Sequence, residues 1–230
     1  MPNLKRQTIS VTLATYNNQD SLDACLQSVT WVDEIIIVDG HSTDKTVEIA
    51  KKYKAKVLLR ENNPIFHVQK QIANETAKSD WVLQLDSDEV VPESLKNEIL
   101  DLLQGRHFGQ DGWISPIKKN INKLFKIFPE PKKLNKPAAA YWLTRKNYFL
   151  GRFLTATGQY PDPIIRLFQR DLAYLPAKSV HEQMVVKGKT GWLTNDYEHY
   201  GTPSFDRYLL REDRYSSLTA QELKDQKVKI

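Results

Sequence analysis

The segment Trp81-Val-Leu-Gln-Leu-Asp-Ser-Asp-Glu89 combines a hydrophobic strand pattern with a cluster of carboxylates. Its first five residues have the composition of a buried strand. Asp86, Asp88 and Glu89 follow at once. Because charged groups near a protein core are costly unless they are paired or bind a ligand, this position indicates a use for the charge. The segment therefore predicts a metal and phosphate site at the carboxyl end of a sheet strand.

The residues around this segment alternate strand patterns with helix patterns. Residues 9–14 alternate apolar with small polar side chains, and residues 34–38 are almost continuously apolar, as in a strand that helices cover on both faces. The predicted strands are 9–14, 34–38, 57–59 and 81–85, and the predicted helices are 21–29, 42–53, 66–77 and 92–103. Ser21 is expected to cap the first helix, and Ser42 or Thr43 the second.

This order predicts an α/β fold with a mostly parallel sheet and right-handed crossovers. In such sheets ligands bind beyond the carboxyl ends of the strands. Tyr16, Asp39 and Asp86 all follow strands at that edge. We therefore expect one binding site that combines residues far apart in the sequence.

The pattern changes after Gly105. We expect a strand at 112–118, a lysine-rich loop at 118–136, a strand at 164–168 and a final helix at 205–224. The loop is either a solvated surface or a basic and aromatic patch that contacts an anionic acceptor or membrane. Arg166 and Arg170 could face phosphates or an acceptor, but Arg166 in a strand could equally be a surface residue. No repeat or linker divides the chain, so we expect a single domain over residues 1–230.

Composition limits the class of protein without deciding its function. The chain has 230 residues, 40% hydrophobic and 27% charged, with one cysteine and a net charge of +5. These values are typical of a globular protein in a reducing compartment. The start has no signal-peptide pattern and no apolar run approaches ~18 residues, so we expect a cytoplasmic protein. The charge suits an anionic ligand, a nucleic acid or an anionic lipid surface.

Asp86 and Asp88 are the strongest candidate metal ligands. Their side chains, two residues apart, fall on one face of a strand or converge in a turn. Carboxylate oxygens suit Mg²⁺ or Mn²⁺, which leave positions open for phosphate oxygens. The alternative is that these acids only end a strand and begin a turn. Glu89 is expected to face solvent or to cap the helix after Pro92, without a chemical role.

An ordered set of motifs resembles a known enzyme family. Thr15-Tyr16-Asn17, Val38-Asp39-Gly40, Ser42-Thr43-Asp44 and Leu85-Asp86-Ser87-Asp88 resemble the amino-terminal half of a family 2 glycosyltransferase with the GT-A fold. Tyr160-Pro161-Asp162, Arg166-Leu167-Phe168, Val180-His181-Glu182 and Glu198-His199-Tyr200 resemble the branch with lipopolysaccharide-core β-glucosyltransferases. The resemblance covers about residues 9–200. It implies one Rossmann-like sheet, with a nucleotide-sugar half at about 8–105 and a smaller mixed acceptor half at about 106–230.

The resemblance also implies roles for individual residues. Lys70-Gln71 stands where the family usually has Arg-Asn, so Lys70 would neutralise a diphosphate without the two-pronged geometry of arginine. His181 is a rival catalytic base to Glu182, and both could instead be a structural pair. The implied assignments are Thr15, Tyr16, Asp39, Lys70, Asp86 and Ser87 for the nucleotide sugar, Asp86, Asp88 and His199 for Mn²⁺ or Mg²⁺, and Glu182 for the catalytic base.

The implied activity is inverting transfer of a sugar from a nucleotide sugar to a saccharide or lipid-linked acceptor in cell-envelope glycan or lipopolysaccharide synthesis. The expected donor is a UDP-sugar, with UDP-glucose as one candidate, and the expected location is the cytoplasm, with contact at the inner face of the membrane. One alternative is a sugar nucleotidyltransferase or nucleotide-binding module, although the chain lacks a phosphate-binding Gly-rich loop. The other is a basic nucleic-acid-binding domain, for which no recognition helix or stacking module is evident.

Overall fold

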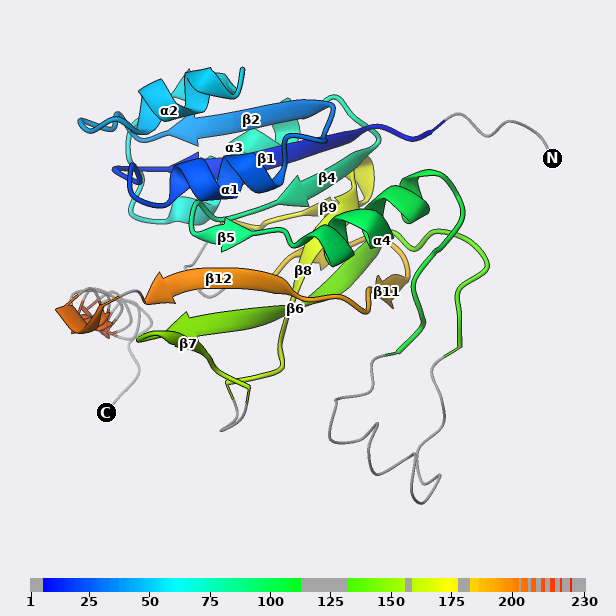
Figure 1. Ribbon diagram of the computed structural model, residues 1–230. Coiled ribbons are helices and arrows are strands. Elements are labelled where there is room, and N and C mark those ends of the chain that lie inside the picture. The colour runs from blue at the N-terminus through cyan, green and yellow to red at the C-terminus, as the bar shows by residue number, and fades with distance from the viewer. Residues whose placement is uncertain are drawn as a thin grey trace.

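The fold of the N-terminal part follows the alternation of strands and helices in the sequence. A computed structural model describes residues 6–112, 132–155, 159–177 and 183–202, with scattered residues between 204 and 224. The N-terminal elements are β1 (Ile9–Thr15), α1 (Leu22–Ser28), β2 (Glu34–Asp39), α2 (Thr46–Lys52), β3 (Lys56–Leu59), α3 (Phe66–Thr76), β4 (Trp81–Gln84), β5 (Glu89–Val90) and α4 (Glu93–Leu103). Figure 1 shows the carboxyl ends of β1 and β2 at one edge of the molecule.

The second part of the chain is built mainly from strands. Its elements are β6 (Ala140–Phe149), β7 (Arg152–Phe153), β8 (Asp162–Gln169), the 3₁₀ helix η1 (Arg170–Leu172), β9 (Ala173–Tyr174), β10 (Val185–Val186), β11 (Thr190–Trp192) and β12 (Tyr197–Thr202). The described residues from 205 to 224 are helical, as expected from the sequence. The strand expected at 112–118 lies almost wholly outside the described residues.

The two parts share one sheet. Its strand order is β3-β2-β1-β4-β8-β6-β12-β5, with β7 and β11 also paired to β6. The strands β3, β2, β1 and β4 are parallel, as predicted. Strand β8 then runs antiparallel to both β4 and β6, and β12 pairs parallel to β6 and antiparallel to β5. The α/β prediction is therefore confirmed, and the complete sheet is mixed.

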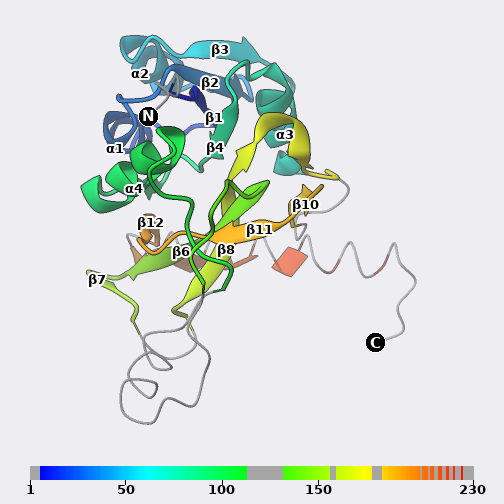
Figure 2. The ribbon, with the colours of Figure 1, turned by 90° about the vertical axis from the view of Figure 1, so that its right-hand side faces the viewer.

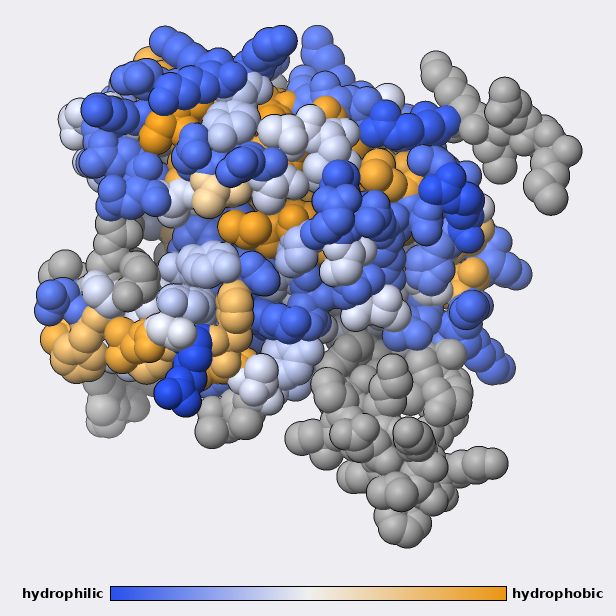
Figure 3. Space-filling model, in the orientation of Figure 1, coloured by the Kyte–Doolittle hydropathy of each residue, from blue (hydrophilic) through white to orange (hydrophobic). Residues whose placement is uncertain are grey.

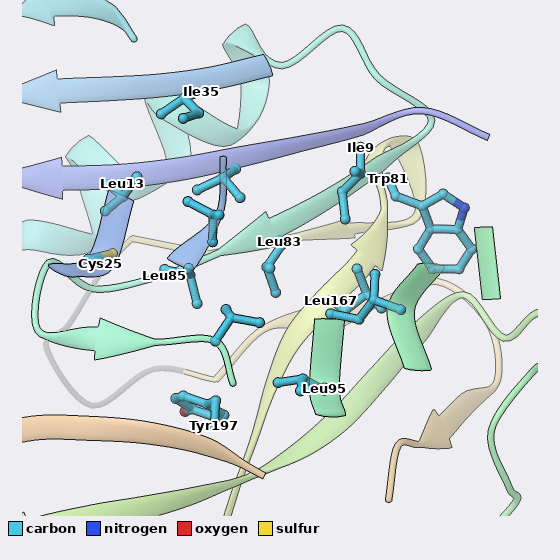
Figure 4. Close-up of a cluster of buried hydrophobic side chains, with 14 of the residues drawn as sticks. Ile9, Leu13, Cys25, Ile35, Trp81, Leu83, Leu85, Leu95, Leu167 and Tyr197 are labelled. Carbon is cyan, nitrogen blue, oxygen red and sulfur yellow. The ribbon is translucent and has the colours of Figure 1, made fainter. Parts of the chain in front are cut away.

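Helices cover both faces of the parallel strands because successive side chains point to opposite sides. In β2, Ile35 and Ile37 join the core beneath α1, α2 and α4, whereas Ile36 and Val38 pack on the side of α3. Figure 2 shows α1, α2 and α4 on one side of the sheet and α3 on the other. Figure 4 shows the larger core, in which Leu167 of β8 lies beside Leu83 of β4. This shared core fixes the second part against the carboxyl end of β4.

The start of α2 differs from the sequence prediction, and the capping bond predicted for α1 is not made. Helix α1 begins after Ser21, but the Ser21 side chain makes no cap hydrogen bond. Helix α2 begins at Thr46 instead of near Ser42, because the side chain of Asp44 accepts a hydrogen bond from the Thr46 backbone N–H at 2.9 Å. Ser42 instead donates to Asp39. Ser21 thus occupies the predicted N-cap position of α1 but makes no capping bond with its side chain, and the prediction that Ser42 or Thr43 caps α2 is wrong.

Within the part of the chain that the structure describes, every helix is too short or too polar to span a bilayer.

Candidate functional site

Asp86 lies where β4 ends and contacts two cations from different elements. One carboxylate oxygen contacts the Lys70 ammonium of α3, and the other lies 2.6 Å from Nη2 of Arg166 in β8. Desolvation raises the pKa of Asp86, but the charges of Arg166 and Lys70 outweigh it and hold that pKa well below its usual range. Asp86 is therefore an ionised carboxylate held by both parts of the sheet.

Glu89 completes this buried ion cluster, and its place contradicts the sequence prediction. Its side chain is 0% exposed, accepts a hydrogen bond from the Asp86 backbone N–H at 2.9 Å and lies 2.5 Å from Arg166 Nη2. Burial raises the pKa of Glu89, against the opposing charge of Arg166. The prediction that Glu89 faces solvent or caps α4 is wrong, because its carboxylate is a buried partner of Arg166.

Arg166 is a buried residue of a strand. The strand prediction is confirmed, but the surface alternative for Arg166 is wrong, since the residue is 2% exposed. Its Nη2 joins Asp86 and Glu89 across sequence separations of 80 and 77 residues. An arginine within Ile164-Ile-Arg-Leu-Phe168 requires carboxylate partners if the strand is buried on both faces. That was the available sequence signal for this pairing.

Asp88 and His199 face each other beside the cluster. Strand β12 pairs with β5, and the Tyr200 backbone N–H donates to the Asp88 carbonyl at 2.8 Å. This pairing brings Nε2 of His199 to 3.5 Å from Oδ2 of Asp88. The other ring nitrogen, Nδ1, lies 2.7 Å from Oδ1 of Asn147 in β6. Because an amide oxygen only accepts, Nδ1 carries a proton and donates to Asn147, and Nε2 is the ring nitrogen that faces Asp88.

This donor set fits a divalent cation that is shared with a phosphate ligand. The Asp88 carboxylate and His199 Nε2 lie 3.5 Å apart, a separation that two ligands of one ion can have when each is about 2.0–2.2 Å from it. In the described ranges there is no group of three or more His, Cys, Asp or Glu side chains that could hold a metal by itself. Mg²⁺ commonly uses one or two protein ligands and completes its shell with phosphate and water. Both oxygens of Asp86 already contact cations, so Asp88 and His199 are the better-placed metal ligands.

The loops after β1 and β2 are tied together around Asp39. Asp39 is fully buried, and it accepts hydrogen bonds from the Thr15 hydroxyl at 2.7 Å and from both the hydroxyl and the backbone N–H of Ser42 at 2.6 and 2.7 Å. Asn17 Oδ1 accepts from the Thr43 backbone N–H at 2.8 Å. Tyr16 projects from this rigid edge with 46% of its surface exposed. The arrangement leaves an aromatic ring free to stack while Asp39 shapes the loop from within.

A cavity of about 790 Å³ adjoins Asp88 on the side of α1. Ser21 and Ala24 line it from one side, and Val90 and Tyr200 from the other. Lys70, Asp86, Asp88 and His199 thus occupy one neighbourhood, with Ser87 buried between the two acids. The site could accommodate an anionic group together with a larger polar molecule.

An apolar surface, which we call the aromatic edge, continues from the cavity. Tyr200 contacts the rings of Tyr148 and Phe153. The aromatic edge consists of Tyr148, Phe149, Leu150, Phe153, Tyr200, Phe205, Tyr208 and Leu209. Leu150, Phe205 and Leu209 are 45%, 56% and 51% exposed. In Figure 3 apolar colour gathers at the lower left, where the β6–β7 hairpin and the last described helical residues lie.

Several predicted residues are not described. His181 and Glu182 lie outside the described residues, as does most of the lysine-rich loop at 118–136. The role of Glu182 therefore stays a prediction.

Asn147 was not identified from the sequence. A polar residue in the strand Ala140–Phe149 does not by itself indicate a side-chain partner on β12.

Comparisons with known proteins match this arrangement. A model of the family described as "Glycosyl transferase family 2" matches residues 10–173. The chain belongs to glycosyltransferase family 2. This membership favours the transferase interpretation over a nucleotidyltransferase, a nucleotide-binding module or a nucleic-acid-binding domain.

Relatives of this family member include both uncharacterised and functionally named proteins. An uncharacterised glycosyltransferase of Rickettsia bellii is 38% identical over 43% of this chain and 34% of its own length. One of Rickettsia felis is 26% identical over 97% of this chain and 73% of the relative. The lipopolysaccharide core biosynthesis glycosyltransferase LpsC of Rhizobium meliloti is 23% identical over 93% and 71%. The alignments with several Rickettsia relatives span about a third of their length.

The fold is similar to that of a solved glycosyltransferase structure. Staphylococcus aureus TarS superposes with a TM-score of 0.54 and 18% identity, over 94% of this chain and 40% of TarS. At this identity the similarity concerns the fold alone. It agrees with the GT-A sheet expected from the motifs.

Proposed function

We propose that this family 2 glycosyltransferase transfers a sugar from a nucleotide-sugar donor to a hydroxyl group of a saccharide or lipid-linked acceptor, with a divalent cation and with inversion at the anomeric carbon. The observation that carries the proposal is the meeting of Asp88 and His199, at 3.5 Å, beside the Lys70–Asp86–Arg166 cluster. This is the carboxyl edge of the parallel strands, where ligands of such sheets bind.

Different residues are proposed to bind different parts of the donor. The exposed ring of Tyr16 would stack on the base, and the loop organised by Asp39 would hold the nucleoside. Lys70 would attract the diphosphate. Asp88 and His199 would hold Mn²⁺ or Mg²⁺, which when bound stabilises the negative charge of a diphosphate leaving group. A UDP-sugar is the proposed donor, with UDP-glucose as the first candidate.

Transfer needs one base. An acceptor oxygen forms a bond to the anomeric carbon as the bond from that carbon to the diphosphate oxygen breaks, and the acceptor proton passes to a carboxylate. We assign that role to Glu182, from its motif. Attack opposite the leaving group gives a product with inverted configuration. The nucleoside diphosphate departs with the bonding electron pair.

The acceptor is proposed to be a lipopolysaccharide-type or other lipid-linked saccharide of the cell envelope. The name of the LpsC relative supports this class. The cavity beside Asp88 offers room for a sugar, and the aromatic edge next to Tyr200 offers an apolar surface for a lipid portion. The proposed location is the cytoplasmic face of the membrane.

A panel of nucleotide sugars tests the function. We expect turnover or hydrolysis of one UDP-sugar in Mn²⁺ or Mg²⁺, with loss of turnover in chelator. Asp88→Ala should weaken UDP binding in Mn²⁺ by roughly tenfold or more and leave binding in chelator unchanged. Failure to bind or turn over any nucleotide sugar in either metal would overturn the proposal.

A further inference from the structure

We propose that Asn147 is a positioning residue that fixes the ring proton of His199 on Nδ1 and so keeps Nε2 available for the cation shared with Asp88. The inference rests on the metal-dependent function proposed above. It concerns a residue that does not touch the cation itself. Its support comes from three successive contacts that lead away from the site.

Sheet pairing places the two residues side by side. His199 in β12 is in register with Asn147 in the parallel neighbour β6, and with Glu89 in β5 on its other side. The first pairing brings Asn147 Oδ1 to 2.7 Å from His199 Nδ1, and the second brings Asp88 to Nε2. The same strand therefore presents one ring nitrogen to each neighbour.

The surroundings of Asn147 determine which way its amide points. Its Nδ2 donates to Oδ2 of Asp162 at 2.9 Å and to the Gln159 carbonyl at 3.4 Å, and both of these atoms are acceptors. A flipped amide would direct its oxygen at a carboxylate, so the observed orientation is the one that satisfies both sides. The Oδ1 atom of Asn147 must then face His199 as an acceptor.

Asp162 is itself held in place. Its Oδ2 accepts from Nε of Arg145 at 2.8 Å and lies 2.7 Å from Nη2 of the same guanidinium. These charge-assisted contacts fix the carboxylate that orients the amide. The chain from Arg145 through Asp162 and Asn147 thus selects the tautomer of His199.

The selection matters because the hydrogen bond at one ring nitrogen decides which nitrogen remains free to bind a metal. Without an acceptor at Nδ1, the proton could move to Nε2 and point at Asp88. A proton there would occupy the place of the cation. Asn147 therefore acts on metal affinity through His199.

The experiment measures the His199 tautomer by ¹H–¹⁵N NMR in metal-free protein, and Mn²⁺ affinity by EPR with and without UDP. Asn147→Leu removes the acceptor with little change in size. We expect the proton on Nδ1 in the wild type, a shift towards Nε2 in Asn147→Leu, and a loss of about 10–100-fold in Mn²⁺ affinity.

Two further variants separate positioning from general damage. The double variant Asn147→Asp/Asp162→Asn exchanges the two groups, so that a carboxylate on β6 still accepts from His199, while the amide on β8 donates to that carboxylate and turns its oxygen to Arg145. It should retain the Nδ1 proton and bind Mn²⁺ within about threefold of the wild type. Lys146→Met changes the adjacent residue of β6, whose side chain points to the opposite face, and should alter neither readout.

The outcomes distinguish the inference from the function on which it rests. An Nε2 proton in the wild type, or an unchanged tautomer in Asn147→Leu, would overturn the role of Asn147 whatever the activity. A shifted tautomer with unchanged Mn²⁺ affinity would overturn its action on the metal. A wild type with the Nδ1 proton that binds no Mn²⁺, even with UDP, would overturn the metal site itself.

Discussion

The two parts of the sheet contribute to the site in different ways. In residues 9–103, short loops after β1 and β2 are joined by hydrogen bonds around Asp39, and β1, β2 and β3 each lead into a helix. In residues 140–202, strands of the same sheet supply Arg166 and His199 to acids of the first part. The first part thus forms a local framework for a nucleotide, whereas the second part pairs with its charges over long sequence separations. Catalysis should depend on the second part as much as on the first.

The largest effect is expected from the proposed base of the second part. Glu182→Gln should lower transfer by about 10²–10⁴-fold, because the acceptor hydroxyl loses its proton acceptor. Donor binding should stay close to that of the wild type, since the nucleotide is held by the first part. Steady-state transfer and UDP-sugar titration measure the two effects. Glu48→Gln, on the exposed face of α2, is the control for a lost carboxylate. Equal loss of donor binding and transfer in Glu182→Gln would show a structural role.

Removing the connection between the two parts should be the most destabilising change. Arg166→Met leaves Glu89 buried without its nearest cation, and the free energy of unfolding should fall by about 3–5 kcal/mol. Urea denaturation measures this fall. Because the double variant Arg166→Met/Glu89→Leu has no orphan charge at position 89, it should recover part of the loss.

Arg170→Met provides the matched control for Arg166→Met. Arg170 follows β8 directly, its side chain is exposed, and it pairs with Asp171 at 3.3 Å on the surface. Its loss should change the free energy of unfolding by no more than about 0.5 kcal/mol. Similar effects of the two substitutions would contradict the idea that burial of the ion cluster couples the two parts.

The same contrast explains how much of the molecule the sequence predicts. The first part was predictable because the apolar run at 34–38 and the amphipathic pattern at 93–103 each indicate a strand or a helix by themselves. The start of α2 differed because Asp44 accepts from Thr46 and Ser42 donates to Asp39. Strands β6 and β12 were missed because Ala140–Phe149 and Tyr197–Thr202 mix polar with aromatic residues. An arginine in an apolar strand indicates a buried acidic partner, but the sequence does not identify Glu89 as that partner, since their pairing depends on the antiparallel approach of β8 to β4.

A smaller effect should follow from loosening the local framework of the first part. Ser42→Ala removes the hydroxyl that donates to Asp39 at 2.6 Å and accepts from the Asn17 backbone N–H at 2.8 Å. Because Asp39 is buried, we expect a loss of about 1–3 kcal/mol in the free energy of unfolding. Thr43→Val is the control, since its hydroxyl makes only a 3.4 Å contact with Asn17. Denaturant titration measures the stability of both variants. Equal stabilities would contradict the role of Ser42 in holding the loops of the first part together.

The smallest effects are expected at two helix starts within the first part, those of α2 and α1. Asp44→Ala removes the acceptor of the Thr46 and Gln19 backbone N–H groups, at 2.9 and 3.1 Å, and should cost about 1 kcal/mol. Ser21→Ala should cost less than about 0.5 kcal/mol, because Ser21 makes no cap hydrogen bond. Chemical denaturation at neutral pH distinguishes the two, and equal costs would contradict a stabilising role for the hydrogen bonds that Asp44 accepts.

Acid should reduce the difference in stability between the wild type and Asp44→Ala. Slight burial raises the pKa of Asp44, but hydrogen bonds from Thr46 and Gln19 outweigh it and leave the pKa below its ordinary value. Because the pKa of Asp44 is lower in the folded than in the unfolded state, its carboxylate stabilises the fold fully at pH values above the unfolded pKa of about 3.9. This contribution is lost as the pH falls through the folded pKa. The stability gap between wild type and Asp44→Ala should therefore be constant from neutral pH down to about pH 5 and narrow below about pH 4. A gap that widened in acid would mean that the Asp44 carboxylate does not hold the loop between β2 and α2.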